Sequence, residues 1–281
     1  MLRAKSVTAL LCVLALSVCA SAVDVYLSPL GSDSRGNGSR AQPYATFGPL
    51  LSRQHVNVIL LAGTYSPSNA TAWRYRFAEN IRAEGTVVID CGGRNDTAPH
   101  FSFPNLGSRW TFGGFTVRNC RSSRPIVDAP AEAVVIVHDV TFADNAFGPS
   151  ALVNCAGLLR AKFVRNIATR VRPGFGTSLV QKTTSDNLLI AQSMFDGNVF
   201  TRGSSPLAPF GRLISAGTGV FPTSRIVVHD SWFLHSPTAI ALTVDTVQSL
   251  TVYNCIFRNL AGSLMAVYGH GVQQPQQNNA R

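Results

Sequence analysis

The chain has 281 residues with 24 basic and 14 acidic side chains, a formal net charge of +10, and nearly all of the basic residues are arginine. Its length is sufficient to bury one large core, and the absence of a long low-complexity linker indicates a single domain. The positive charge favours anionic polymers or lipid headgroups as partners, because arginine binds carboxylate and sulfate groups through two hydrogen bonds. The alternative is that a solvated β-surface simply carries its charge as arginine.

Residues 1–22 have the pattern of a secretory signal peptide. Arg3 and Lys5 precede an apolar run over 7–18, and Ala20-Ser21-Ala22 supplies the small residues that signal peptidase accepts. An uncleaved anchor would need a longer run, since about 20 apolar residues are required to cross a bilayer. Cleavage would leave 22 basic and 14 acidic residues on a secreted protein, and secretion disfavours nucleic acid as the partner. No later segment approaches the length of a membrane span.

The N-terminal third contains three matches to the N-glycosylation acceptor pattern, at Asn37, Asn69 and Asn95. Chance alone would give about two such matches in a chain this rich in Asn, so their number decides little. In a eukaryotic protein they would mark exposed loops.

A basic aromatic stretch follows in the same region, formed by Trp73, Arg74, Tyr75 and Arg76. Exposed aromatic faces stack on sugar rings, and arginine pairs with carboxylate or sulfate, so this stretch is the best candidate for glycan binding. The alternative is a partly buried segment that packs against the end of the domain.

Six later stretches repeat one pattern: an apolar alternation, a turn residue, a Phe and then a polar residue. They end at Asn119, Asn145, Asn166, Asn198, Ser236 and Asn259, and their Phe landmarks are roughly 21 to 38 residues apart, a spacing typical of stacked coils. The two-residue alternation predicts strands whose inward residues build a parallel-sheet core. The predicted inward pairs are Trp110/Phe112, Val135/Val137, Leu188/Ile190, Ile226/Val228 and Leu250/Val252.

Two corners are predicted in each coil. Gly114, Asp139, Asp230 and Asn254 occupy equivalent places at one of them, and these residue types tolerate the left-handed backbone of a sharp bend. The asparagines that end the repeats predict a second corner with a ladder of stacked amides, at Asn119, Asn145, Asn166, Asn198 and Asn259.

The two longest intervals between repeats contain irregular, basic segments rich in Gly, Pro and Ser. These segments, 170–178 and 201–212, are predicted to protrude as loops. The second of them carries Arg202 and Arg212, which we predict to bind anionic glycans together with the arginine-bearing flank.

These elements together resemble the right-handed parallel β-helix of the pectin-lyase-like superfamily. Residues 24–38 followed by 42–47 are similar to the opening segment of many secreted β-helix proteins, and 58–65 and 87–93 are similar to their first coils. The resemblance implies a short helix around Leu50-Leu51 that caps the open end of the barrel. The Phe-Xaa-Xaa-Asn element also resembles the repeats of polymorphic outer-membrane adhesins. Their companion Gly-Gly-Ala-Ile element is missing, which argues against an autotransporter role.

Four cysteines follow the predicted signal peptide: Cys91, Cys120, Cys155 and Cys255. In an oxidising compartment they permit two disulfides in three connectivities. Buried free thiols are the alternative, because small core positions accept cysteine readily. No Cys-Xaa-Xaa-Cys or Cys/His cluster is present, so a zinc site is not expected.

Enzymes of the resembled superfamily act on acidic polysaccharides, which makes a few residues catalytic candidates. Asp139 and Asp230 could converge by stacking into a carboxylate pair, and Arg160 could serve as the base of a calcium-dependent lyase. His270 lies in a Gly-His-Gly that resembles one polygalacturonase motif, but the companion motifs of that family are absent. The competing interpretation is structural in each case: a corner aspartate, one of many arginines, and a turn.

We therefore predict an all-β protein with a signal peptide at 1–22, a single-stranded right-handed parallel β-helix with a short N-terminal cap at 23–270, and a disordered polar tail at 271–281. The predicted role is structural, adhesive or glycan-binding and non-catalytic, without metal or cofactor, outside the cell or on its surface. The predicted partner is an anionic polysaccharide or a cell-surface glycan. The alternative is a divergent polysaccharide lyase or glycoside hydrolase acting on acidic polysaccharide.

Overall fold

The computed structural model describes residues 22–53, 56–67, 73–75, 78–95, 98–102, 109–128, 134–148, 151–154, 160–172, 178–182, 187–199, 211–216, 223–245, 247–261 and 265–268. The predicted signal peptide, apart from its last residue, and the predicted polar tail lie outside these ranges.

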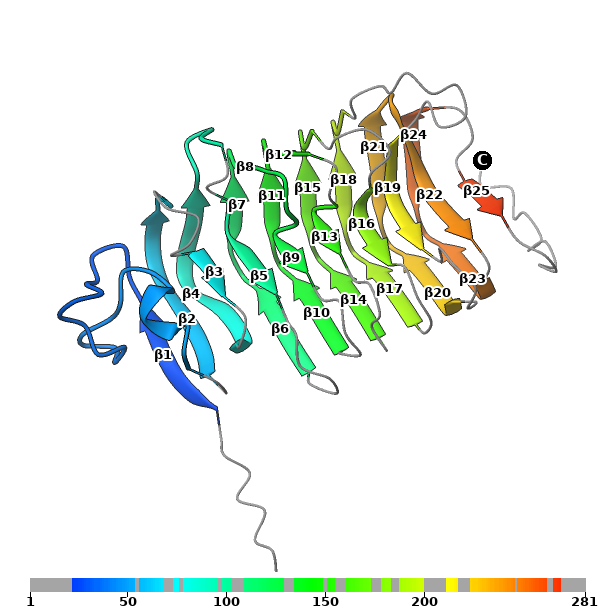
Figure 1. Ribbon diagram of the computed structural model, residues 1–281. Helices are drawn as coiled ribbons and strands as arrows, with labels where there is room; N and C mark the ends of the chain where they lie inside the picture. The colour runs from blue at the N-terminus through cyan, green and yellow to red at the C-terminus, as the bar shows by residue number, and fades with distance from the viewer. Residues whose placement is uncertain are drawn as a thin grey trace, which may run out of the picture.

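The described chain winds into coils that stack along one axis (Figure 1), and every strand pair is parallel. One 15-stranded sheet supplies two faces of the solenoid, and an 8-stranded sheet supplies a third. The first face contains β6 (Arg109–Gly113), β10 (Val134–His138), β14 (Arg160–Val164), β17 (Asn187–Ala191), β20 (Thr223–His229) and β23 (Val247–Tyr253). The second face contains β7 (Thr116–Arg118), β11 (Thr141–Ala143), β15 (Ile167–Thr169), β18 (Met194–Asp196), β21 (Trp232–Ser236) and β24 (Ile256–Leu260).

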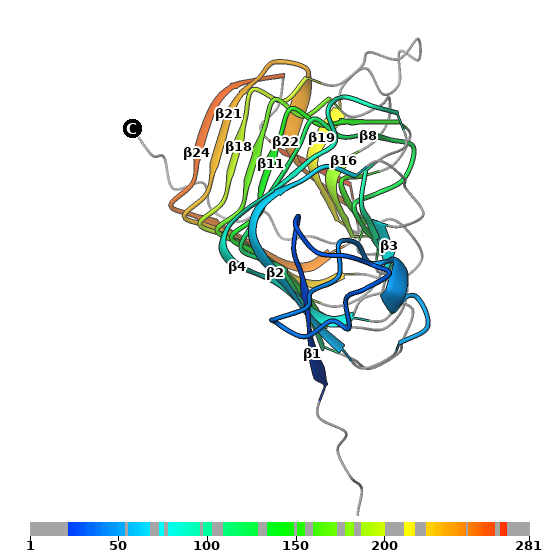
Figure 2. The ribbon, with the colours of Figure 1, turned by 90° about the vertical axis from the view of Figure 1, so that its left-hand side faces the viewer.

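The third face is built by β3 (Arg74–Tyr75), β5 (His100–Ser102), β9 (Val127–Asp128), β13 (Val153–Asn154), β16 (Ser178–Lys182), β19 (Gly211–Ala216), β22 (Ala239–Asp245) and β25 (Met265–Tyr268). A short pair, β8 (Arg121–Ser122) and β12 (Ala146–Phe147), lies between the second and third faces. Figure 2 looks along the stack and shows successive coils lying behind one another. The predicted all-β parallel β-helix is confirmed.

The first coils are formed by β1 (Val23–Leu27), β2 (Val56–Tyr65) and β4 (Ala78–Asp90). The long β4 pairs with β6 before its bend at Gly85 and with β7 after it, which joins the first two faces into one sheet. Between β1 and β2 a single 3₁₀ turn, Gly48–Leu50, buries Leu50 in the core. This turn lies where the resemblance implied a short capping helix.

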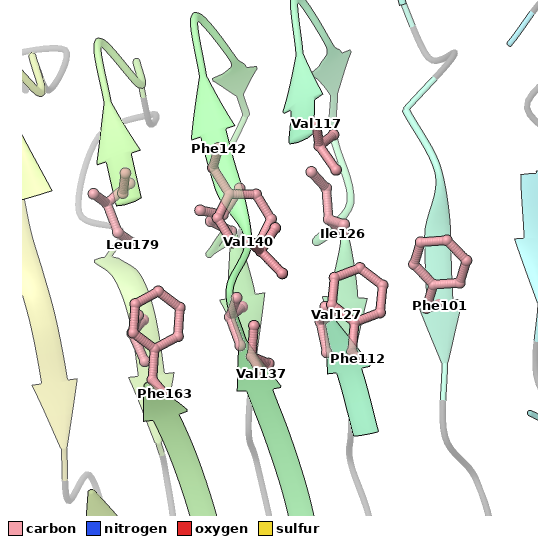
Figure 3. Close-up of a cluster of buried hydrophobic side chains, with 14 of the residues drawn as sticks. Phe101, Phe112, Val117, Ile126, Val127, Val137, Val140, Phe142, Phe163 and Leu179 are labelled. Atoms are coloured by element: carbon pink, nitrogen blue, oxygen red, sulfur yellow. The ribbon is translucent and has the colours of Figure 1, made fainter. Parts of the chain in front are cut away.

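The core is a set of ladders in which each inward residue pairs with its equivalent in the next coil. On the first face Phe112 pairs with Val137, and Val137 with Phe163. Phe101 and Val127 form the matching ladder on the third face (Figure 3), and all of these side chains are buried. The predicted inward pairs are confirmed by register and burial, except in the last coil, where Leu250 is half-buried and Val252 is exposed.

One of the six repeats is misaligned in the prediction, because its Phe does not occupy the place of the Phe in the preceding repeat. Phe163 lies on the first face, whereas Phe142 lies on the second, where its partner in the next coil is Ala168. The interval from Phe142 to Phe163 is therefore not one coil. Hydrogen bonds between equivalent corner positions join residues 25, 26 and 27 apart, and 38 apart across the coil that contains the 201–210 segment.

The predicted continuous amide ladder is also wrong, because the asparagines occupy three different places. Asn119 and Asn259 lie at the bend itself with positive φ, while Asn145 and Asn198 are buried one residue further along the second corner. Asn166 is buried at the first corner instead. The equivalent residues in neighbouring coils are Val140, Ser193 and Ser231.

The buried asparagines act as clamps between coils. Asn145 Oδ1 accepts a hydrogen bond from the Cys120 amide at 2.9 Å, and its Nδ2 donates to the Val117 carbonyl at 2.9 Å. Buried main-chain groups at a bend must find partners, and a side-chain amide offers one donor and one acceptor together. Each such Asn therefore satisfies the turn of the preceding coil.

Cys91 and Cys120 form a disulfide between the ends of β4 and β7. Cys255 is a free, half-buried thiol whose Sγ lies 3.2 Å from the Tyr253 carbonyl oxygen, and Cys155 lies outside the described residues. One disulfide is thus present among the described residues, and Cys255 follows the alternative of a partly buried free thiol.

Candidate functional site

The basic aromatic stretch does not present an exposed Trp73. The indole is 3 % exposed and packs edge-on against Phe47 and Tyr65, with ring centroids 5.3 and 5.6 Å apart. Trp73 is one of the apolar side chains that fill the interior of the first coils. The expectation of an exposed Trp73 is wrong, and its ring is not available for stacking on a sugar.

The other predicted binding residues do not form one described surface. Arg74 and Tyr75 lie in strand β3, and Arg76 and Arg202 lie outside the described residues. Arg212 belongs to strand β19, where it pairs with Ser178 and Ile240, so the predicted 201–212 loop ends before it. The reason is that residues 211–216 continue the third-face ladder with buried Leu213 and Ile214.

The two aspartates proposed as a carboxylate pair lie on the same corner, as predicted. The corner column runs Gly114, Asp139, Arg165, Gln192, Asp230, Asn254, and all six residues have positive φ. Asp139 and Asp230 are thus three coils apart, which at the strand spacing of a sheet is about 14 Å. Inverting glycosidases need carboxyl groups about 6.5–9.5 Å apart, so this pair does not meet that geometry.

Asp139 has two basic neighbours. The Arg165 guanidinium donates two hydrogen bonds to it, from Nε at 2.7 Å and from an Nη at 2.6 Å, and His138 Nδ1 lies 2.6 Å away. These contacts, led by the Arg165 hydrogen bonds, lower the pKa of Asp139 to about 2. A carboxylate held so strongly in its ionised form is a poor general acid.

Asp230 is held in a similar way by His229, whose Nδ1 lies 2.7 Å from its carboxylate. That hydrogen bond is the main cause that lowers the pKa of Asp230. The Arg160 backbone lies in β14, and His270 lies outside the described residues. The Asp139/Asp230 pair is therefore not in the catalytic arrangement considered from the sequence.

The second corner creates a different feature, a cleft rich in arginine. Its bend residues with positive φ include Asp144, Arg170 and Gly197. Two residues beyond each bend the chain places an outward side chain in the same column, in the order Arg121, Ala146, Arg172, Val199. The order follows from β8–β12 pairing, from the Ala146–Arg172 bridge and from the hydrogen bond of the Val199 amide to the Val171 carbonyl.

These residues line a cleft of about 300 Å³ together with Asp144, Arg170 and Gly197. Arg170 is committed to Asp144, donating from Nε at 2.6 Å and from an Nη at 2.7 Å. The pKa of Asp144 is lowered, first by that hydrogen bond and further by the charges of Arg170, Arg172 and Arg118. Three guanidinium groups against one carboxylate leave the cleft with a formal surplus of two positive charges.

Arg121 and Arg172 are the free cations of this cleft. Both are exposed, and within the part of the chain that the structure describes neither side chain has a hydrogen bond or ion pair. They are separated by two coil steps, about 10 Å at the strand spacing of a sheet. Val199 adds exposed apolar surface beside them. Such a surface can take a ligand with two anionic groups and an apolar body between them.

Sequence reasoning missed this cleft although its signal is present. The segments Asn119–Arg121 and Arg170–Arg172 share a spacing in which an arginine follows the bend by two residues. The predicted loop 170–178 pointed to the region, but the pairing of Arg121 with Arg172 requires the register of coils more than 50 residues apart in the sequence.

Two predicted glycosylation acceptors, Asn37 and Asn95, are exposed, and Asn69 lies outside the described residues. Among the residues that the structure describes, no three His, Cys, Asp or Glu side chains gather as a metal site. No helix in those same ranges has the length and hydrophobicity to cross a membrane.

Comparison of the chain with known protein families, with curated proteins and with solved structures returned no match. The parallel solenoid is thus established by the structure itself, while membership of the pectin-lyase-like superfamily stays a prediction.

Proposed function

We propose that this protein is a secreted, non-catalytic module that binds anionic polysaccharide in the cleft lined by Arg121 and Arg172. The observation that carries the proposal is a pair of exposed guanidinium groups, about 10 Å apart along the solenoid axis, that form no hydrogen bond or ion pair with a described carboxylate. A parallel β-solenoid fits a structural or adhesive role, because stacked coils give an extended surface on which a polymer can lie.

The chemistry of the cleft supports an acidic glycan over a neutral one. Guanidinium groups bind carboxylate and sulfate through paired, charge-assisted hydrogen bonds, and the spacing of repeated anions along a polymer allows two arginines to act together. The apolar Val199 and Ala146 lie in the same column and can contact the ring carbons of a sugar. The overall positive charge of the chain supports attraction to such a polymer.

The Cys91–Cys120 disulfide supports the secreted location, because disulfides persist mainly in oxidising compartments. It agrees with the signal-peptide pattern at 1–22. Immunoblotting of culture medium and cells, with the Ala20-Ser21-Ala22 site intact or altered, tests this part of the proposal.

The binding test compares two double variants with the same change in charge. Arg121→Gln with Arg172→Gln removes both free cations, and Arg35→Gln with Arg225→Gln removes two exposed arginines elsewhere. Affinity for heparin and for pectate is measured by titration at several salt concentrations. We expect the cleft variant to bind at least about 10-fold more weakly, since a hydrogen bond to a charged group contributes about 1.5–3 kcal/mol. The control should lose about 3-fold or less.

Equal losses in the two variants would mean that binding follows net charge and would contradict a site in the cleft. The same samples are assayed with calcium for unsaturated products and new reducing ends. Turnover by the wild-type protein would contradict the non-catalytic part of the proposal and favour a lyase or hydrolase.

A further inference from the structure

We propose that the C-terminal end of the solenoid is a docking surface for a second copy of this chain, which associates tail to tail. The inference does not depend on the arginine cleft. It rests on a difference between the two ends of the stack, which lie at opposite sides of Figure 1.

The last coil leaves three strand edges without a neighbour among the described residues. β23 and β24 stand at the two ends of the large sheet, and β25 stands at one end of the third-face sheet. Together these strands contain 16 residues. An unpaired edge presents a row of amide and carbonyl groups that pairs readily with another strand.

The interior of the last coil is also uncovered. Val252 is 37 % exposed, whereas its partner in the preceding coil, Val228, is 1 % exposed. Phe257 and Leu250 are only partly buried, although Phe233, the partner of Phe257, is fully buried. Side chains of the core ladder are therefore exposed to solvent at this end of the stack, and burying them against a partner would be favourable.

The N-terminal end is covered over its first coil, although the two-residue strand β3 also stands at an end of the third-face sheet. The outer edge of β1 is already paired, because the Tyr26 amide donates to the Gly38 carbonyl and the Tyr44 amide donates to the Tyr26 carbonyl. Phe47 and Leu50 fill the space inside the first coils. A head-to-tail arrangement would have to place the open C-terminal coil against this covered first coil. An identical open end is the better complement, and two such ends form a closed dimer with two-fold symmetry.

Composition favours a second copy over the segment 269–281 as the cover. The segment 269–281 contains Val272 and Ala280 as its only apolar side chains besides glycine and proline. The strands β23 and β24 contain one charged residue, Arg258, and neither Lys nor Pro, the residues that commonly protect an edge. Two such ends can approach without strong repulsion despite the net positive charge. With their turns, the 16 strand residues come close to the ~20–30 residues that each side of a standard interface uses.

The test measures self-association of the whole protein by sedimentation equilibrium over a wide range of concentration. We expect a monomer–dimer equilibrium that Val252→Asp abolishes over that range, because the carboxylate would be buried without a partner. Val23→Asp is the matched control: it places the same change at the opposite end, on a side chain that is 63 % exposed, and should leave the equilibrium unchanged.

Hydrogen exchange of the unaltered protein tests the same surface without a variant. Protection of the amides in 247–260 should rise with protein concentration, while protection of β1 should not. A protein that stays monomeric at every concentration would overturn the proposal. Strong protection of 247–260 in a protein that sediments as a monomer would show that the cover comes from the same chain.

Discussion

Charged side chains at the corners of this solenoid bind the coil before them. Arg165 reaches Asp139, Arg170 reaches Asp144 and Arg118 reaches Asp90, each across one coil. The partners are about one-fifth to three-fifths exposed, so water screens each pair and its contribution to stability is small. This role accounts for Asp139 without catalysis and leaves Arg121 and Arg172 as the cations that can act on a ligand.

The ion pair between Asp139 and Arg165 should make the stability of the protein depend on pH. Because the folded pKa of about 2 lies below the ordinary value of 3.8, the pair stabilises the protein above about pH 4 and loses its contribution as the pH falls toward 2. Asp139→Asn keeps a residue that tolerates positive φ but removes the charge. We expect the variant to be less stable by about 1 kcal/mol or less at pH 7, a figure limited by solvent exposure, and equal to wild type near pH 2.

Urea unfolding of both proteins between pH 2 and pH 7 measures this difference. Asp24→Asn, a change to an exposed aspartate whose hydrogen bond from Asn57 an amide oxygen can also accept, serves as a reference for any general effect of losing a carboxylate. A stability difference for Asp139→Asn that stayed constant across the range would show that the ion pair is not its cause.

At the scale of the element, the first corner repeats one backbone conformation whatever residue occupies it. The Asp139 amide donates to the Val164 carbonyl, the Arg165 amide to the Ala191 carbonyl and the Gln192 amide to the His229 carbonyl. Each coil thus ties its bend to the next coil, so that Arg165 and Gln192 adopt positive φ although their side chains disfavour it.

Gln192→Gly should therefore stabilise the protein. Its φ of 49° costs a non-glycine residue roughly 1 kcal/mol, and the exposed Gln192 side chain has no hydrogen bond among the described residues. We expect a gain of up to about 1 kcal/mol, reduced by the greater freedom of glycine in the unfolded chain. Thermal or urea unfolding measures it.

Thr251→Gly is the control for the corner effect. Thr251 is an exposed strand residue on β23, where glycine should cost about 0.5–1 kcal/mol. A loss of stability in both variants would mean that the bend at Gln192 stores no strain.

The whole molecule is a one-dimensional stack, in which each coil contacts mainly its neighbours. Damage to one coil should consequently remain local. The Cys91–Cys120 disulfide joins residues 29 apart in the first part of the stack. Replacing both cysteines with alanine should lower the free energy of unfolding by about 3–4 kcal/mol, a value that rises with the logarithm of the length of the loop that the bond closes.

Hydrogen exchange should locate that loss. Amides of β2, β4 and β7 are expected to lose protection more than those of β20 and β21. Cys255→Ala changes a thiol that forms no disulfide and should cost about 1 kcal/mol or less. A uniform loss of protection along the whole chain would contradict the stacked description and indicate one cooperative unit.

The solenoid could be predicted from the sequence because its signals are local. A two-residue alternation determines which side chains of a strand face inward, and Gly114, Asp139, Asp230 and Asn254 tolerate the bend that each of them occupies. Both properties depend on a residue and its immediate neighbours. They can therefore be inferred from the sequence without knowing which strands pair between coils.

Only the tertiary structure decided what depends on register across a whole coil. The phase of Phe163 and Asn166, the burial of Trp73 and the pairing of Asp139 with Arg165 each require a partner far along the sequence. Coils of unequal length hide that register from the sequence. The same reason applies to the cleft, because Arg121 and Arg172 become one site only when the intervening coil sets them about 10 Å apart on a single column.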